Sequence, residues 1–233
     1  MQKIIKITQI ISNLIFPIEC ALCRFSGKYL CASCENNLTV KKINKKLSID
    51  IENKSFALYD YKDGLVKKLL FKLKYNHHPR LAEIMGNYSK EFIEKNIMEG
   101  ESFAFALVPI PISEKRLRER GYNQAYHISI GIDKSKTFNI LKRIKNTNKL
   151  KDSNSVDARL SEIENSMSVD AETMNKALED IRKDIIENNY LNNLKIILID
   201  DITTTGATFY EARRALMEHG FLKENIYSFA LAH

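Results

Sequence analysis

Tryptophan is absent from this chain of 233 residues, and proline and glycine are scarce, at four and eight copies. With 44% hydrophobic and 28% charged residues, this scarcity excludes collagen-like, low-complexity and wholly disordered chains. No apolar run reaches the roughly 18 residues that a membrane-spanning helix needs. Residues 1–16 come closest, but Lys6, Gln9, Ser12 and Asn13 interrupt them and no small-residue cleavage site follows. We therefore expect no membrane span, no signal peptide and a cytoplasmic protein.

Cysteine is also scarce, and all four copies lie in two Cys-x-x-Cys pairs separated by seven residues: Cys20 with Cys23, and Cys31 with Cys34. Each pair can turn two thiolates toward one point, and two such pairs complete a tetrahedron around Zn²⁺ at about 2.3 Å. Two disulfides are the alternative, but a cytoplasmic chain keeps its thiols reduced. A thioredoxin-like redox site needs only one such pair. Four sulfur ligands leave no position for water, so we predict a structural zinc ion that stabilises a segment too small for its own core.

The charge balance favours basic residues, because 36 Lys and Arg against 29 Asp and Glu give a net charge of +7. Such an excess favours anionic partners such as phosphates, nucleotides or nucleic acid. Basic residues dominate between residues 115 and 151, and acidic residues dominate between 152 and 187. Two oppositely charged, solvated faces are the plainer interpretation of this distribution, and both interpretations stay open.

Apolar patterns of strand type and of helix type alternate along the chain. We predict strands at residues 55–61, 103–110, 195–200 and 226–231. We predict helices at residues 3–15, from 64 onward, and at 80–96, 121–131, 156–164, 171–187 and 207–219. Residues 41–53 are interpreted as a polar connector and 145–155 as a mobile loop. Strands that alternate with helices predict an α/β fold with a mainly parallel, doubly wound sheet.

The most informative segment runs from Ile196 to Thr208, where an apolar strand leads into two adjacent carboxylates, a Thr/Gly turn and a helix. Ligands of open parallel sheets collect at the carboxyl ends of the strands, and Asp200 and Asp201 lie at such an end. The turn aims backbone N–H groups and hydroxyls at one point, and the helix N-terminus adds partial positive charge. The residues of this turn are Thr203, Thr204, Thr205, Gly206, Ala207 and Thr208. A simple helix cap uses only one such residue, so we predict a site for a phosphate monoester with two carboxylates beside it.

This segment resembles the phosphoribosyl-diphosphate-binding motif of type I phosphoribosyltransferases, and the whole chain resembles the ComF family of competence proteins. That family joins an N-terminal four-cysteine zinc module to a phosphoribosyltransferase-like domain, which here implies a module at residues 1–45 and a domain at 54–233. Three further stretches carry the resemblance: Leu73-Lys-Tyr75, Val108-Pro-Ile-Pro-Ile-Ser113 and Arg118-Glu-Arg-Gly-Tyr-Asn-Gln124. Between about residues 145 and 194 the match is poor. Leu150 stands near the place of an expected Gln, and residues 171–193 form a longer insert than the family norm.

The resemblance implies that Asp200 and Asp201 form the catalytic pair, which holds the ribose hydroxyls, and that the Thr/Gly turn holds the 5-phosphate. It puts the diphosphate beside residues 109–111. The candidate residues for neutralising the diphosphate are Ser113, Lys115 and Arg116. Mg²⁺ would bridge diphosphate and ribose oxygens, and the reaction would displace diphosphate at C1 of the ribose.

A role in DNA uptake during natural transformation is also implied by the resemblance. The nucleotide pocket would hold a phosphoribosyl group, a basic surface would bind single-stranded DNA, and DNA-uptake proteins would be partners. Binding of single strands needs a cationic groove with stacking aromatic side chains, for which residues 71–80 and 116–126 are candidates. The diphosphate or nucleic-acid contacts in the second stretch are Arg118, Arg120, Tyr122, Asn123 and Gln124. An amphipathic helix and a solvated helix start are the plainer interpretations of the two stretches.

Two other functions stay open at this point. One is an active phosphoribosyltransferase of nucleotide salvage, although no residue identifies an acceptor base. The other is a catalytically idle regulator that senses nucleotides. A shared fold does not decide among these functions, because unrelated sites are built on the same scaffold.

Overall fold

The computed structural model describes residues 17–40, 42–46, 54–75, 78–98, 104–145, 163–183 and 194–233. The helix predicted at 3–15, nearly all of the loop predicted at 145–155 and most of the helix predicted at 156–164 lie outside the described residues. Leu150 and the last ten residues of the 171–193 insert, 184–193, also lie outside them. Among the helices within the described ranges, none combines the length and the apolar character required to cross a membrane.

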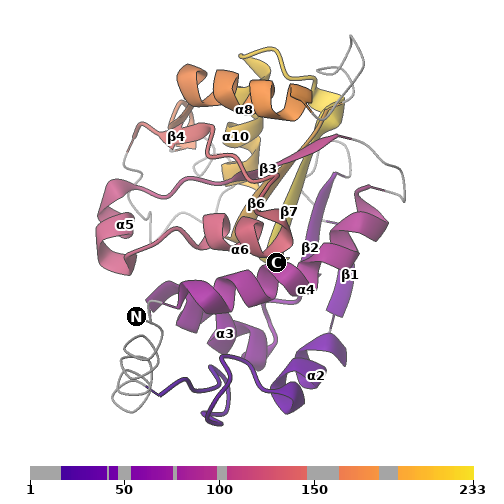
Figure 1. The fold of residues 1–233 in the computed structure, drawn as a ribbon, viewed down its shortest axis with the longest axis vertical. Helices are drawn as coiled ribbons and strands as arrows, with labels where there is room; N and C mark the ends of the chain where they lie inside the picture. The colour runs from indigo at the N-terminus through magenta and orange to yellow at the C-terminus, as the bar shows by residue number, and fades with distance from the viewer. Residues whose placement is uncertain are drawn as a thin grey trace, which may run out of the picture.

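A five-stranded sheet forms the centre of the fold (Figure 1). Its strands, in spatial order, are β1 (Lys42–Lys46), β2 (Ser55–Tyr59), β7 (Ile226–Ala232), β6 (Lys195–Ile202) and β3 (Phe105–Pro109). Strands β2, β7, β6 and β3 run parallel, and Ile197 of β6 lies opposite both Leu107 of β3 and Tyr227 of β7. Strand β1 pairs antiparallel with β2. The predicted α/β fold with a mainly parallel sheet is confirmed.

Strand β1 corrects the polar connector predicted at residues 41–53. Its sequence, Lys-Ile-Asn-Lys-Lys, is too polar for a strand buried on both faces. At the edge of a sheet a strand pairs on one side only, and lysines there discourage pairing with another chain. The register shifts between Lys42 and Lys45, as it does at a bulge. The polarity of this segment therefore suits its position at the edge.

Helices cover both faces of the sheet (Figure 1). They are α2 (Ala32–Val40), α3 (Gly64–Tyr75), α4 (Pro79–Asn96), α5 (Glu114–Arg120), α6 (Gln124–Asp133), α8 (Ala171–Lys183) and α10 (Ala207–Met217), with a 3₁₀ turn at Lys223–Asn225. Helix α5 and the antiparallel hairpin of β4 (Leu141–Arg143) and β5 (Met167–Val169) were not predicted. Helix α5 buries no residue, so its sequence shows no apolar stripe. Ser113 caps its start, and Gly121, with a φ of 73°, ends it.

Helices α4 and α6 approach each other so closely that only glycine fits at the contact. A Cβ atom added to Gly86 would lie 2.0 Å from the carbonyl oxygen of Ile128. A Cβ atom added to Gly131 would lie 1.9 Å from the carbonyl oxygen of Glu83. The two glycines thus allow backbone to touch backbone. Helix α6 in turn contacts β3 and β6, so this crossing fixes the helix against the strands that carry the candidate site.

Two hydrophobic clusters lie on opposite faces of the sheet and follow the alternation of side chains along β6. Ile197 and Ile199 belong to the cluster that includes residues of α3, α4 and α6. Ile196 and Leu198 belong to the other, with residues of α8 and α10. The first cluster also contains residues of the cysteine segment: Cys20, Leu22, Leu30, Cys31 and Leu38. The cysteine segment and the sheet domain therefore share one hydrophobic core.

A buried ion pair ties α10 to the β4–β5 hairpin. The Glu211 side chain is buried and accepts the Met167 N–H at 3.1 Å. Arg214 donates to the two carboxylate oxygens of Glu211 at 2.8 and 2.9 Å, and to the Met167 carbonyl at 3.1 Å. These hydrogen bonds join the hairpin to the helix that begins at the Thr/Gly turn.

Candidate functional site

The two adjacent carboxylates lie near the carboxyl end of β6, because the strand continues to Ile202. Successive residues of a strand face opposite sides of the sheet. Asp201 therefore continues the side of Ile199, toward α3, and Asp200 continues the side of Leu198, toward α10. Asp201 is buried and Asp200 is half-buried. The Asp201 N–H donates to Asp200 Oδ1 at 2.8 Å and fixes the orientation of that carboxyl group.

Lys74, in the last turn of α3, meets Asp201. Its Nζ lies 3.1 Å from Asp201 Oδ2. The contact is an ion pair without hydrogen-bond geometry, so Asp201 Oδ2 is a buried oxygen that accepts no hydrogen bond from the described residues. Sequence reasoning missed the contact, because no local pattern relates the end of one helix to a carboxylate so distant in the chain.

The proton affinity of Asp200 is unusual. Burial raises the pKa of Asp200 well above its ordinary range, and the negative charge of Asp201 raises it further. The Asp201 N–H and the Lys74 ammonium oppose this rise only in part. Burial also raises the pKa of Tyr122, and the charge of Asp201 adds to the rise. Ionisation of Asp200 is therefore less favourable than that of an ordinary aspartate.

The Thr/Gly turn connects β6 to α10. Gly206 has a φ of 78°, in the left-handed region that favours glycine. Thr203 is buried, and its N–H donates to a β7 carbonyl at 3.0 Å. Thr205 Oγ1 accepts the Ala207 N–H at 3.5 Å. Thr204 is exposed, and Thr205 and Thr208 are half-buried. The N-terminus of α10 thus opens beside the two carboxylates, with hydroxyls around it.

Two of the predicted diphosphate contacts cap helices. Ser113 Oγ accepts the Arg116 N–H at 3.3 Å at the start of α5. Asn123 caps α6 by accepting the Ala125 N–H at 3.0 Å, and its amide donates to the Ile110 carbonyl at 3.0 Å. Both side chains therefore shape the segment that follows β3.

Two further predicted contacts connect that segment to α3. The Tyr122 hydroxyl donates to the carbonyl of Leu73, and the Gln124 amide donates to the same carbonyl at 3.3 Å. Both side chains are buried. They hold the end of α3, and hence Lys74, beside Asp201.

The predicted basic residues divide into two groups. Lys115 and Arg118 are exposed, and Arg118 is 3.5 Å from Glu114. Arg116 and Arg120 are half-buried and line a groove, and Arg120 donates to Gln124 Oε1 at 3.0 Å. The structure therefore brings Arg116 and Arg120, but not Lys115 and Arg118, into one concave surface with Lys74.

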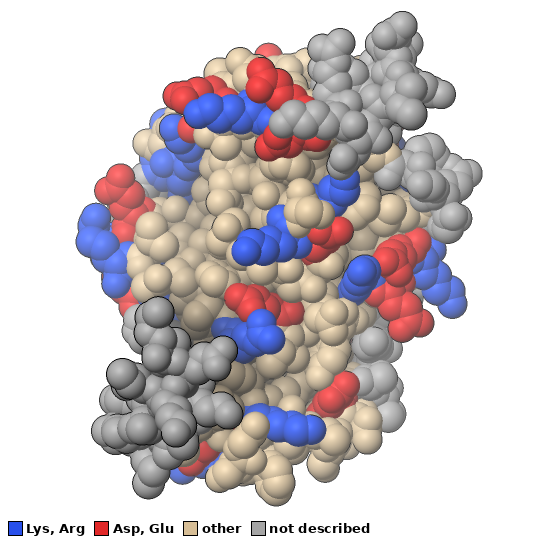
Figure 2. Space-filling view, viewed as in Figure 1, with Lys and Arg blue, Asp and Glu red and all other residues tan. Residues whose placement is uncertain are grey.

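This surface, which we name the α3–α5 groove, has a volume of about 610 Å³. Its lining residues are Tyr61, Lys67, Lys68, Leu70, Phe71, Lys74, Tyr75, Arg116 and Arg120. The lining includes five cationic and three aromatic side chains and no carboxylate. The rings of Phe71 and Tyr75 are 4.7 Å apart, and the side chains are 58% and 54% exposed. On the face shown in Figure 2, basic and acidic side chains of the described residues are interspersed.

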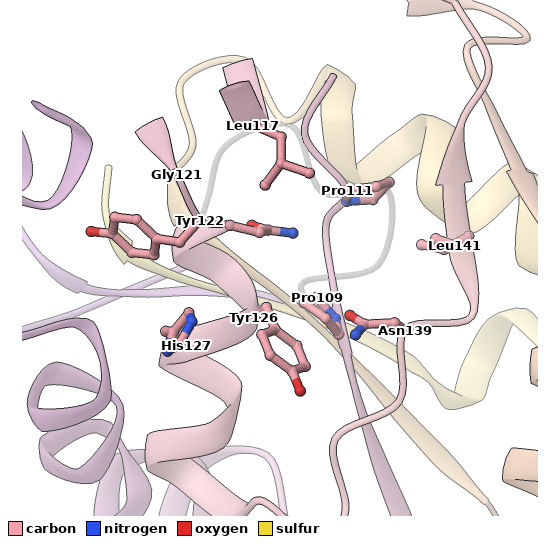
Figure 3. Close-up of a pocket in the computed structure, with 10 residues that line it drawn as sticks. Pro109, Pro111, Leu117, Gly121, Tyr122, Tyr126, His127, Asn139 and Leu141 are labelled. Atoms are coloured by element: carbon pink, nitrogen blue, oxygen red, sulfur yellow. The ribbon is translucent and has the colours of Figure 1, made fainter. Parts of the chain in front are cut away.

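A second cavity, of about 350 Å³, lies between the end of β3, the start of α6 and the beginning of β4. Its lining residues include Pro109, Pro111, Leu117, Tyr126 and Asn139 (Figure 3). Half of the ten lining residues are polar: Tyr122, Asn123, Tyr126, His127 and Asn139. The Tyr122 ring at its margin is turned away from this cavity, toward α3 (Figure 3).

The four cysteines form one cluster, as predicted. All four Sγ atoms lie within 4.8 Å of one another, and those of Cys23 and Cys31 are 3.5 Å apart. Sulfurs arranged tetrahedrally at the Zn–S distance are about 3.8 Å apart, so the cluster is compatible with zinc. All four are free thiols, without the disulfides considered as an alternative. Burial opposes ionisation of Cys20, but backbone hydrogen bonds outweigh it and lower the pKa of its thiol to about 6. Gly27, with a φ of 91°, reverses the chain between the pairs.

The fold and the site define a class of protein in which a four-cysteine module precedes a parallel α/β domain with paired carboxylates at a strand end. No protein-family model matches the chain. The chain is 30% identical over 167 residues to the competence protein ComFC of Bacillus subtilis (strain 168). The match covers 70% of this chain and 58% of that protein, so the chain spans little more than half the length of this relative. The predicted resemblance to the ComF family is thus confirmed, and the chain is a homologue of ComFC.

Proposed function

We propose that this chain is a competence protein that acts in DNA uptake and binds a phosphoribosyl ligand, such as phosphoribosyl diphosphate, at the end of β6. The observation that carries the ligand proposal is the succession of a buried strand, two carboxylates, a Thr/Gly turn with Gly206 at a φ of 78°, and a helix start. The similarity to ComFC supports the role in DNA uptake. DNA-uptake proteins are the partners that this role requires.

In this proposal each part of the site binds one part of the ligand. Asp200 and Asp201 accept hydrogen bonds from the ribose hydroxyls, and the buried Asp201 Oδ2 gains the donor that the described residues do not supply. The hydroxyls of Thr204, Thr205 and Thr208 and the N–H groups at the start of α10 bind the 5-phosphate, whereas the Thr203 N–H is bonded to a β7 carbonyl. The carboxylates are hard oxygen ligands of the type that Mg²⁺ prefers. Mg²⁺ would neutralise the diphosphate and join it to the ribose oxygens.

Single-stranded DNA is the second ligand of the proposed function, and the α3–α5 groove is its site. The groove combines cations for the phosphates with exposed aromatic rings on which bases can stack. Such binding weakens as the salt concentration rises. In a plot of the logarithm of the binding constant against the logarithm of the salt concentration, each contacted phosphate contributes a slope of about −0.7. A labelled oligonucleotide titrated at two salt concentrations measures this slope.

Calorimetry with the zinc-loaded full chain, phosphoribosyl diphosphate and Mg²⁺ tests the ligand site. The wild type should bind, and the double variant Asp200→Asn with Asp201→Asn should bind at least about tenfold more weakly, because each carboxylate loses a charged hydrogen bond. Asp133→Asn is the matched control and should bind like the wild type, because the Asp133 carboxylate lies at the end of α6, where it accepts the Ser135 N–H and hydroxyl. If the wild type gives no binding heat, or if the double variant binds like the wild type, the assignment is wrong.

An active phosphoribosyltransferase is the second candidate, and the cavity beside Pro109 and Pro111 favours it. The Tyr126 ring and the Asn139 amide in its wall suit a flat heterocyclic acceptor next to the predicted place of the diphosphate. Release of diphosphate in the presence of a panel of bases would identify such an activity. If the chain binds phosphoribosyl diphosphate but releases no diphosphate with any base, the transferase is excluded and the function in DNA uptake remains.

A further inference from the structure

The α3–α5 groove and the carboxylate pair meet at one side chain. Lys74 lines the groove, and its Nζ is also 3.1 Å from Asp201 Oδ2. The inner end of the groove is therefore next to the predicted ribose position. Tyr122 and Gln124 hold the carbonyl of Leu73 and so fix this junction.

The cations of the groove are not neutralised by its own wall. Within the described residues, Lys74 is the one of the five that lies within ion-pair distance of a carboxylate. Lys68 donates to the Leu22 carbonyl, and the Lys67 ammonium lies 5.6 Å from the centre of the Tyr61 ring. Neither contact removes a charge. The groove therefore presents a positive field that begins at Lys74 and continues outward.

A phosphoribosyl diphosphate bound as proposed would direct its diphosphate to this inner end. The 5-phosphate and the 1-diphosphate are attached at opposite ends of the ribose. If the 5-phosphate lies at the Thr/Gly turn, the diphosphate therefore lies on the other side of the carboxylates. On the side of the sheet that Asp201 faces, the nearby cations are Lys74, Arg116 and Arg120. The same three cations would bind phosphates of a single strand that lies in the groove.

We propose that phosphoribosyl diphosphate and single-stranded DNA compete for the inner end of the α3–α5 groove, so that each ligand displaces the other. This inference rests on the proposed function, because it takes both ligands as given. Two polyanions do not share three cations in a confined volume, since their phosphates would repel each other at close range. The inner end of the groove thus binds either phosphoribosyl diphosphate or single-stranded DNA. The concentration of phosphoribosyl diphosphate therefore regulates the binding of single-stranded DNA.

The test is the affinity for a labelled thymidine oligonucleotide, measured by anisotropy on the zinc-loaded full chain at constant salt and Mg²⁺. Phosphoribosyl diphosphate at ten times its own Kd should raise the apparent Kd of the oligonucleotide about elevenfold, as mass action requires of a competitor. Ribose 5-phosphate at ten times its own Kd is the matched control ligand. It has the same sugar and 5-phosphate without the diphosphate, so it should change the oligonucleotide Kd less than about twofold.

Variants at the outer end of the groove separate the two ligands. Phe71→Ala removes a stacking ring and should weaken oligonucleotide binding about fivefold or more, while the calorimetric Kd of phosphoribosyl diphosphate stays unchanged. Ile144→Ala, which removes an exposed apolar side chain that does not line the groove, is the control for Phe71→Ala and should leave both affinities unchanged.

Three outcomes would overturn the inference. Saturating phosphoribosyl diphosphate could leave the Kd of the oligonucleotide unchanged, it could lower that Kd, or the oligonucleotide could fail to bind at all. Displacement by ribose 5-phosphate as strong as that by phosphoribosyl diphosphate would also overturn it, because the diphosphate would then not be the competing group. If calorimetry shows no binding of phosphoribosyl diphosphate, the proposed ligand site itself fails. The two failures are thus distinguishable.

Discussion

Asp200 and Asp201 are neighbours on one strand, and their proximity has a cost to the folded protein. The raised pKa of Asp200 means that the folded chain binds a proton there more tightly than the unfolded chain does. Between the ordinary pKa of Asp and the raised value in the fold, the native state binds more protons than the unfolded state. Its stability therefore falls as the pH rises through this window.

Asp200→Asn should accordingly stabilise the unliganded protein at neutral pH, because the amide carries no charge to desolvate and can still accept the Asp201 N–H. We expect the Tm of the variant to exceed that of the wild type by a few degrees at pH 7 to 8, and the difference to vanish near pH 4. Thermal unfolding at several pH values measures this difference. Asp133→Asn, half-buried at the end of α6, is the control. A lower Tm for Asp200→Asn at neutral pH would contradict the assigned origin of the raised pKa.

The sequence was informative about these residues only where the chemistry is local. Two Cys-x-x-Cys pairs predicted the sulfur cluster, and the two acids before the Thr/Gly turn predicted a strand end followed by a helix start. The ion pair of Lys74 with Asp201 was not predictable, because it depends on how α3 packs against the sheet. The buried hydrogen bonds of Tyr122 and Gln124 to the Leu73 carbonyl were not predictable for the same reason.

Helices and strands whose apolar residues recur at regular spacing were predicted from the sequence. Elements that are stabilised mainly by caps, edge position or hydrogen bonds were not predicted. Helix α3 buries Val66, Leu69, Leu70 and Leu73 at helical spacing, and β6 is an apolar run covered on both faces. Helix α5 depends on its caps, β1 on its edge position, and the β4–β5 hairpin on hydrogen bonds to Glu211 and Arg214. None of these leaves a periodic pattern in the sequence. The boundary of β6 was also extended, since the strand includes both carboxylates.

The crossing of α4 and α6 gives a prediction about packing. Gly131→Ala would place a methyl group 1.9 Å from the Glu83 carbonyl oxygen, so the helices must move apart. We expect a loss of at least about 1–3 kcal/mol in the free energy of unfolding, as for other overpacked cores. Gly64→Ala is the matched control, because a Cβ at the start of α3 meets no atom within 4 Å, and it should be neutral or slightly stabilising. Urea denaturation measures both, and equal stabilities of the two variants would refute the close contact.

The molecule as a whole is joined by the hydrophobic cluster that contains both the cysteine segment and the first face of the sheet. Leu22, Leu30 and Leu38 are nearly inaccessible to solvent, and each stabilises the fold by about 1.5–3 kcal/mol through its burial. Lys68 of α3 also donates to the Leu22 carbonyl. We therefore propose that the predicted module at 1–45 and the domain at 54–233 unfold as one cooperative unit, although the metal ligands belong to the module alone.

Removal of zinc should consequently destabilise the entire chain and not only its cysteine segment. Metal analysis should find one zinc ion per chain, and chelation should lower the Tm of a single unfolding transition by about 10 °C or more, because the four thiolates would lose the ion that holds them together. Cys34→Ser should reproduce this lower Tm without a chelator, and a chelator should then have no further effect. A chain in which chelation leaves the main transition unchanged and produces a second, separate one would show that the two parts fold independently.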